Sequence, residues 1–211
     1  LRAMLRAGAV GDVSIMFPMV CGVGDFRDAL DVVREAAEGL LEDRVVCRRD
    51  VPVGCMMEVP SAVIVADLLA RDAAFFSIGT NDLVQYALAI DRANERVAHL
   101  YQPFHPAMLR LIRQTVEAGR AAGIPVSMCG AMAEDPLALP LLVGLGLERL
   151  SIAPAAIPLA KAVVRAIRME DARKVAEAAL ALSTAEEVTA AASEFAAGAF
   201  PALLDGPACD C

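Results

Sequence analysis

The sequence predicts an α/β fold in which strands and helices alternate and the strands form a parallel sheet. Two observations predict it. Short apolar runs rich in Val, Ile, Met and Phe recur along the chain, and a segment with helical periodicity follows each of them. Five such strand-then-helix units in series are typical of a parallel sheet. At 211 residues, the chain has room for one domain of barrel or doubly wound type, or for two small ones.

The predicted elements follow this rhythm. After an opening helix over 1–9, the strands are expected at 13–17, 51–57, 73–78, 124–128 and 149–152. The helices that follow them are expected at 24–42, 60–70, 82–90, 107–122, 135–143 and 158–167. Residues 91–106 interrupt the rhythm and are predicted to be a long connection, the kind of segment that often carries function.

Local signals support several helix ends. Pro60 stands in a first turn, where its missing N–H costs little, and Gly123 follows the helix over 107–122 as a C-cap. Residues 170–197 show only Ala-rich helical periodicity, broken near Thr184, where Glu187 completes a capping box.

Two architectures fit five units. A closed (β/α)8 TIM barrel needs eight strands and about 250 residues, so this chain would supply only its last five βα units. Residues 1–168 would then belong to the barrel, 169–200 would be C-terminal helices packing on it, and 201–211 would be a tail. The alternative is a complete open sheet with helices on both faces. No Gly-rich phosphate motif follows the first strand, which favours the barrel. Because the chain begins at Leu1 within a helical pattern, we expect a piece of a longer polypeptide.

Composition excludes several function classes. The formal net charge of -8 and the pI near 4.8 argue against a general binder of nucleic acid or anionic membranes. Although 57% of the residues are hydrophobic, no apolar stretch is long enough to span a bilayer. Six cysteines without a signal peptide indicate reduced thiols in a cytoplasmic protein. Cys209 and Cys211 are expected in a frayed tail rather than in a metal site.

Four predicted strands end in polar or reactive residues. These are Glu58, Asn81 with Asp82, Cys129 and Ser151. In a barrel the strand ends meet at one mouth, so Glu58 and Asp82 are expected to hold a divalent ion together. Two carboxylates completed by waters and a ligand oxygen suit Mg²⁺ or Mn²⁺ better than Zn²⁺, which prefers His or Cys.

Each of these residues also has an ordinary structural interpretation. Asn81 and Asp82 fit a helix N-cap, and Glu58 fits a solvated strand end. Cys129 fits either a buried inert thiol or, at a metal site, a proton donor or nucleophile.

Cationic candidates lie in the long connection. Arg92 fits a ligand for a phosphate or carboxylate, or a surface partner of Asp91 or Glu95. The two histidines, His99 and His105, are interpreted as loop structure rather than catalytic groups.

Several longer motifs resemble one known family. They are Gly54–Glu58, Phe75–Tyr86, Asp91-Arg92, His99–Tyr101 and Met128–Gly130. Over residues 1–195 the sequence closely resembles Enzyme I of the bacterial phosphoenolpyruvate-dependent sugar phosphotransferase system. The motifs are long and occur in the family's order, so the resemblance is specific.

The resemblance implies a role for each matching position. Glu58 and Asp82 fall on the family's Mg²⁺ ligands. Asn81, Asp82 and Arg92 fall at the phosphoenolpyruvate site, and Cys129 falls on the proton donor to the enolpyruvate carbon. One position departs from the family pattern, because Ala131 stands where a Glu is usual.

The resemblance also implies partners and leaves alternatives open. In the family the phosphoryl group passes to a histidine on a separate amino-terminal domain and then to the carrier HPr, in a cytoplasmic homodimer without membrane insertion or nucleic acid. The chain alone is therefore expected to be inactive. The alternatives are an enzyme like pyruvate phosphate dikinase or phosphoenolpyruvate synthase, and a non-catalytic dimerisation module.

Overall fold

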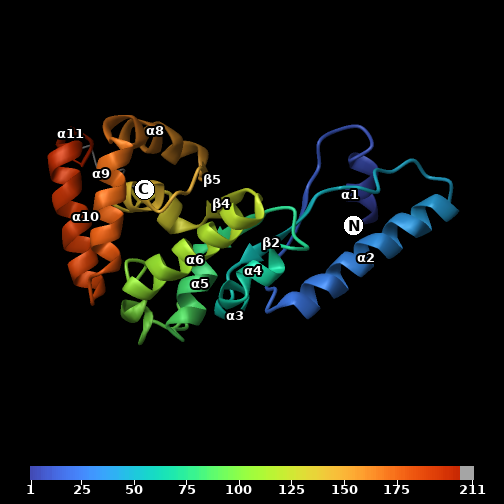
Figure 1. Cartoon of the computed structure of the whole chain (residues 1–211), viewed down its shortest axis with the longest axis horizontal. Helices are drawn as coiled ribbons and strands as arrows, with labels where there is room; N and C mark the ends of the chain where they lie inside the picture. Colours follow the sequence, from blue (N-terminus) through green and yellow to red (C-terminus); the bar gives the residue numbers. More distant parts are fainter. Residues whose placement is uncertain (205–211) are drawn as a thin grey trace.

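A five-stranded parallel sheet forms the centre of the molecule. The computed structural model describes residues 1–204. The strands are β1 (Ile15–Phe17), β2 (Val53–Met57), β3 (Phe76–Gly79), β4 (Val126–Cys129) and β5 (Arg149–Leu150), and each pairs in parallel with the next. Figure 1 shows α1 and α2 at one end of the molecule and α8 to α11 at the other.

Helices follow the strands along the chain. The α-helices are α1 (Arg2–Ala7), α2 (Val23–Glu42), α3 (Pro60–Ile64), α4 (Ala66–Leu69), α5 (Thr80–Ala87), α6 (Pro106–Ala122), α7 (Ala138–Gly144), α8 (Ile157–Ala166), α9 (Met169–Leu180), α10 (Ala185–Ala199) and α11 (Pro201–Leu204). Short 3₁₀ helices are η1 (Ala98–Leu100), η2 (Ala131–Ala133) and η3 (Pro154–Ala156).

The strand order decides between the two predicted architectures. The order is β1-β2-β3-β4-β5, so each strand is added to the edge left by the one before it. A doubly wound sheet reverses direction after its first strands, and no reversal occurs among the described strands. The predicted α/β fold with five parallel strands is therefore confirmed and resembles a TIM barrel. The alternative prediction, a complete open sheet with helices on both faces, is wrong.

The two faces of the sheet differ in polarity. On the outer face Cys55, Phe76, Ile78 and Met128 are fully buried. On the inner face Met56, Ser77 and Ser127 lie side by side in register. Helix α6 approaches the outer face closely, because a Cβ atom at Gly119 would lie 2.3 Å from Val126 Cγ2.

Several boundaries differ from the sequence prediction. The helix expected over 60–70 is interrupted at Val65, whose φ of -107° and ψ of 24° separate α3 from α4. Helix α5 begins at Thr80, directly after β3, rather than at Asp82. The 3₁₀ turn η2 was not predicted.

Within the segment predicted as a tail, 201–211, the first four residues are helical. Pro201–Leu204 forms α11, since proline is well suited to a first helical position. The preceding Phe200 is buried with Leu139 and Val163, which anchors the start of α11. Cys209 and Cys211 lie outside the described residues.

The C-terminal helices pack on the end of the sheet domain. A Cβ at Gly144 would lie 2.1 Å from the Ala172 carbonyl oxygen, so α9 contacts the end of α7 directly. The predicted capping box is confirmed, with the Glu187 N–H donating to Thr184 Oγ1 at 3.2 Å. Gly123 has a φ of 71° and forms the predicted left-handed C-cap.

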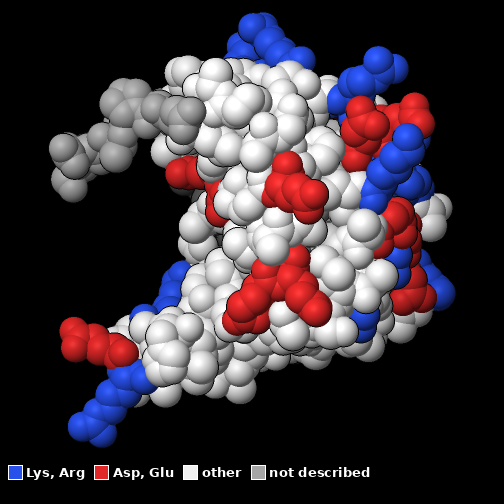
Figure 2. All heavy atoms as spheres, turned by 90° about the vertical axis from the view of Figure 1, so that its left-hand side faces the viewer, with Lys and Arg blue, Asp and Glu red and all other residues white. Residues whose placement is uncertain are grey.

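The surface of these helices carries dispersed charge. On the face that Figure 2 shows, some acidic groups lie near the centre, and others lie beside the basic groups at the margins. No helix within residues 1–204 is long and apolar enough to cross a membrane.

Candidate functional site

The carboxyl ends of β2, β3 and β4 bring the predicted site residues together. In the sheet register Gly79 lies opposite Cys129, and Met57 lies opposite Ile78. Glu58 therefore emerges beside Gly79, and a Cβ atom at Gly79 would lie 2.7 Å from Glu58 Oε2. Glycine at this position leaves room for the carboxylate at the inner end of the sheet.

Glu58 is a buried carboxylate. Its side chain is only 3% exposed, so its interpretation as a solvated strand end is wrong. Oxygen Oε1 accepts a hydrogen bond from the Met19 N–H at 2.7 Å. A buried carboxylate needs hydrogen bonds or a counterion. The second oxygen, Oε2, lies toward Gly79 and is available for a cation.

Asn81 and Asp82 lie in the first turn of α5, but they do not cap it. The N-cap residue is Gly79, and it makes no side-chain capping bond. Asn81 Oδ1 accepts instead from the Ala131 N–H at 3.1 Å, across to the segment after β4. Asp82 Oδ1 accepts from Arg92 Nη2 at 3.3 Å. The ordinary N-cap interpretation is therefore wrong.

The long connection returns to the site. Arg92 pairs with Asp82 rather than with Asp91 or Glu95 in the described contacts. Both side chains are partly exposed, so the ion pair contributes little to stability. Tyr101 Oη donates to the Asn81 carbonyl oxygen at 3.4 Å. Burial raises the pKa of Tyr101, and the nearby Arg92 opposes that shift.

Cys129 ends β4, opposite Gly79 in the register of the sheet. Burial raises the pKa of the Cys129 thiol above the usual value, a hydrogen bond with Ser77 lowers it, and the negative charges of Glu58 and Asp82 raise it further. The thiol therefore keeps its proton near neutral pH. It is only partly buried, so it is not sealed in the core, and a protonated, accessible thiol can act as a proton donor.

The carboxylate pair fits an open Mg²⁺ site. Glu58 follows β2 and Asp82 lies in the first turn of α5, directly after β3, so the two carboxylates stand at the carboxyl ends of adjacent parallel strands. Among residues 1–204 no cluster of three or more His, Cys, Asp or Glu residues is arranged to hold a metal. A closed zinc site needs such a cluster, whereas Mg²⁺ usually takes one or two carboxylates plus water and ligand oxygens.

The remaining polar candidates serve the backbone. His105 Nδ1 accepts from the Ala107 N–H at 3.1 Å and caps α6, and His99 lies in η1. Ser151 extends the sheet pairing, with its N–H donating to the Met128 carbonyl oxygen at 2.8 Å. The four cysteines within the described residues are free thiols, as predicted.

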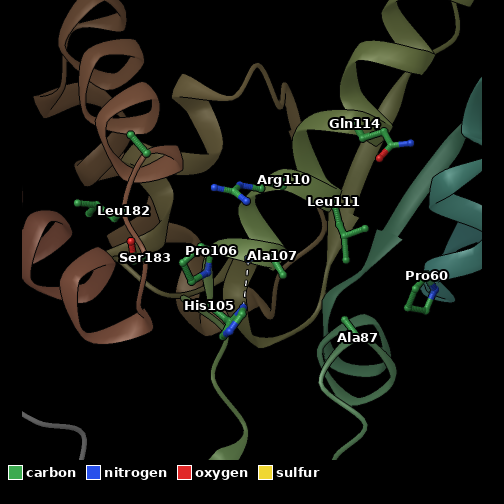
Figure 3. Close-up of a pocket in the computed structure, with 11 residues that line it drawn as sticks. Pro60, Ala87, His105, Pro106, Ala107, Arg110, Leu111, Gln114, Leu182 and Ser183 are labelled. Carbon is green, nitrogen blue, oxygen red and sulfur yellow. Dashed lines mark hydrogen bonds between the residues drawn. The ribbon is translucent and has the colours of Figure 1, made fainter.

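A pocket of about 590 Å³ lies away from this site, between α3, α5, α6 and the 181–183 segment. Figure 3 shows Arg110 between His105 and Gln114 along α6. Arg110 Nη2 donates to the Leu180 carbonyl oxygen at 3.2 Å, which ties α6 to the end of α9. The residues that line this pocket include neither Glu58 nor Cys129. The polar side chains of this pocket hold helices together. The candidate site therefore does not coincide with this pocket, despite its volume.

Comparison with known proteins shows the family to which the chain belongs. Residues 1–169 match the family described as "PEP-utilising enzyme, PEP-binding domain". The chain belongs to this family. It is 47% identical over 188 residues to phosphoenolpyruvate-protein phosphotransferases from Bacillus sp. (strain S) and Geobacillus stearothermophilus. It is 44% identical over 194 residues to that of Bacillus subtilis (strain 168). These matches cover 89% to 92% of the chain.

The chain spans about a third of the length of these curated relatives, 32% to 34%. The predicted resemblance to Enzyme I is confirmed by their names and identities. Among solved structures, a citrate lyase from Burkholderia xenovorans LB400 is similar with a TM-score of 0.55 and 20% identity, covering 92% of this chain and 65% of the other. This likeness concerns the fold alone.

Three contributions to the site were not predicted from the sequence: two main-chain N–H groups and one serine. The N–H groups of Met19 and Ala131 contact site side chains, and main-chain donors leave no signature in residue types. Ser77 lies on the inner face beside Cys129, but a serine within an apolar run gives no specific signal.

Proposed function

We propose that this chain is the carboxyl-terminal part of the phosphoenolpyruvate-binding domain of an Enzyme I. The whole protein would transfer the phosphoryl group of phosphoenolpyruvate to a protein histidine and release pyruvate. The observation that carries the proposal is the placement of Glu58, Asp82 and Cys129 at the neighbouring carboxyl ends of β2, β3 and β4. Asn81 contacts the segment after β4, and Arg92 pairs with Asp82.

Glu58 and Asp82 would hold Mg²⁺ at the strand ends. When bound, the ion neutralises the negative charge of the phosphate and of the enolate oxygen that develops as phosphate leaves. The two carboxylates alone would repel an anionic substrate, which supports the presence of a cation between them and the ligand.

Asn81 and Arg92 would bind the anionic substrate. Because Asn81 Oδ1 is held by the Ala131 N–H, its amide nitrogen is left to donate to a phosphate oxygen. The Arg92 guanidinium, paired with Asp82 here, would offer its planar fork to phosphate or carboxylate oxygens. Fixed donors of this kind stabilise the charge of the transition state.

Cys129 would complete the reaction after the phosphoryl group has left. The pyruvate enolate takes the thiol proton at its terminal carbon, so a C–H bond forms and the S–H bond breaks. Pyruvate is released, and the thiolate regains a proton from solvent. The raised pKa of Cys129 supports this role because it keeps the donor protonated.

We assign the acceptor histidine, and the contact with the separate carrier HPr, to the rest of the protein, and we propose that the whole protein is a cytoplasmic homodimer that dimerises through this domain. The support is that the chain covers only a third of its relatives. At the position of the family Glu, Ala131 offers only its N–H, so proton return to Cys129 would come from another source.

Single-turnover transfer from phosphoenolpyruvate in the full-length parent, with Mg²⁺, tests this function. We expect Asp82→Ala to abolish transfer, and Cys129→Ala to block mainly pyruvate release while phosphohistidine still forms. Arg110→Ala is a matched control, because Arg110 lies on the outer side of α6. A wild type that dimerises but transfers nothing would instead support the non-catalytic dimerisation module. Formation of ATP from AMP and phosphate or pyrophosphate, in place of transfer to a carrier protein, would support the dikinase or synthase alternative.

A further inference from the structure

The loop after β1 makes a direct contact with the candidate metal ligand. Met19 follows β1 by two residues, and Glu58 follows β2 by one, so the two lie at adjacent strand ends. The Met19 N–H donates to Glu58 Oε1 at 2.7 Å. Hydrogen bonds to an ionised carboxylate are short and strong, and this one lies where Glu58 is almost completely buried.

The backbone of Met19 has an unusual conformation. Its φ is 55°, in the left-handed region that side chains with a Cβ atom seldom adopt. Such conformations persist where the surrounding structure fixes them, and they occur often at functional sites. In this turn the Met19 N–H group points from the end of β1 toward Glu58, at the end of the neighbouring strand β2.

Other contacts of the same loop fix this conformation. Ser61 Oγ, at the start of α3, donates to the Cys21 carbonyl oxygen at 2.8 Å. The Cys21 N–H donates to Asp25 Oδ2 at 3.0 Å. The Met19 side chain itself is 49% exposed. The Met19 sulfur makes only a long contact with Tyr86 Oη, at 3.9 Å, whereas the contact with Glu58 is made by the main chain.

We propose that the Met19 N–H is a positioning group for Glu58, which occupies Oε1 and leaves Oε2 as the single oxygen for a divalent cation. Oε2 lies toward Gly79, where only a glycine leaves space. Glu58 would then offer a single oxygen, Oε2, to the ion. This inference rests on the proposed function, because it assumes that Glu58 is a metal ligand.

Substitutions at position 19 separate the main chain from the side chain. Met19→Gly keeps the N–H and accepts a positive φ without strain. Met19→Val keeps the N–H but disfavours that φ, since valine is branched at Cβ. The probe is Mn²⁺ alone, titrated into the full-length parent and followed by electron paramagnetic resonance. We expect Met19→Val to weaken Mn²⁺ binding at least tenfold, the usual effect of losing a group that orients a ligand, and Met19→Gly to stay within about twofold of the wild type.

A second measurement needs no disruptive variant. In protein labelled with ¹⁵N-methionine, the Met19 amide signal is identified by its loss in Met19→Gly. We expect its proton to resonate downfield, as for a donor to a carboxylate, and to move upfield in Glu58→Gln. This result is expected even if Met19→Val fails to fold.

The outcomes distinguish this inference from the proposed function. If Met19→Val binds Mn²⁺ like the wild type, or if Met19→Gly loses as much affinity as Met19→Val, the positioning role is wrong. An amide signal unchanged by Glu58→Gln also overturns it. If the folded wild type binds no Mn²⁺ although the amide signal responds to Glu58→Gln, the metal site of the proposed function is wrong while the contact remains.

Discussion

The outer and inner faces of the sheet have different tasks. On the outer face Phe76 and Met128 are fully buried beneath helices, and the contacts there are apolar. On the inner face the same two strands present Ser77 and Cys129, and the strand ends add Glu58. Because side chains alternate along a strand, neighbouring residues of one strand belong to different environments. Along one strand, the residues that face outward therefore contribute to stability, and those that face inward contribute to the candidate site.

This comparison predicts that adjacent residues of β3 respond differently to truncation. Phe76→Ala is expected to reduce the free energy of unfolding by about 3 to 5 kcal/mol, because it leaves a cavity on the outer face. Ser77→Ala, on the opposite face, is expected to cost less than about 1.5 kcal/mol. Urea unfolding of the two variants measures the difference. Equal losses would mean that the two faces are packed alike.

At the inner end of the sheet, the charge of Arg92 is expected to contribute to activity rather than to stability. Arg92→Ala is predicted to lower kcat/KM for phosphoenolpyruvate in the full-length parent by about 10² to 10³, the usual effect of removing one charge-stabilising donor. Its ion pair with Asp82 is partly exposed, so the unfolding free energy should change by less than about 1 kcal/mol. Steady-state kinetics and thermal unfolding test both parts. A large loss of stability with normal kinetics would make Arg92 a structural residue.

Cys55, on the outer face, is expected to make the free energy of unfolding depend on pH. Burial, and then the charge of Glu58, raise the pKa of this thiol from 9.0 to about 12. Above pH 9 the unfolded state releases a proton that the folded state retains, so stability falls as pH rises toward 12. By about pH 10.5 the loss is about 2 kcal/mol.

Chemical unfolding between about pH 8 and pH 10.5 measures this loss. Cys55→Ala removes the ionisable group and should flatten the decline relative to the wild type. Identical slopes in the two proteins would show that Cys55 is not protected from ionisation.

The smallest effect is expected at the outer pocket. Arg110→Ala removes the hydrogen bond to the Leu180 carbonyl oxygen and should cost about 1 kcal/mol of unfolding free energy. Phosphotransfer by the full-length parent should stay within about twofold of wild type, because the pocket lies outside the sheet. A tenfold loss of activity would bring this pocket into the function and weaken the division between the faces.

The regular parts of the molecule could be predicted from the sequence. Apolar runs and helical periodicity located the strands and the long helices because both depend on local pattern and burial. The sequence singles out Glu58, Asn81, Asp82 and Cys129 as candidates because they stand at strand ends, and the structure places them there. The features that could not be predicted depend on the conformation and hydrogen bonds of the main chain. The break at Val65, the turn at Met19 and the contact from Ala131 arise from tertiary packing and from N–H groups that every non-proline residue shares.

The contact between Asn81 and residue 131 affects how this site tolerates change over generations. Because the donor is a main-chain N–H, any residue except proline supplies it. A lineage can therefore replace the side chain at position 131 and still keep the Asn81 amide oriented. The alanine found here therefore holds Asn81 as any non-proline residue would, because its methyl group takes no part in the contact.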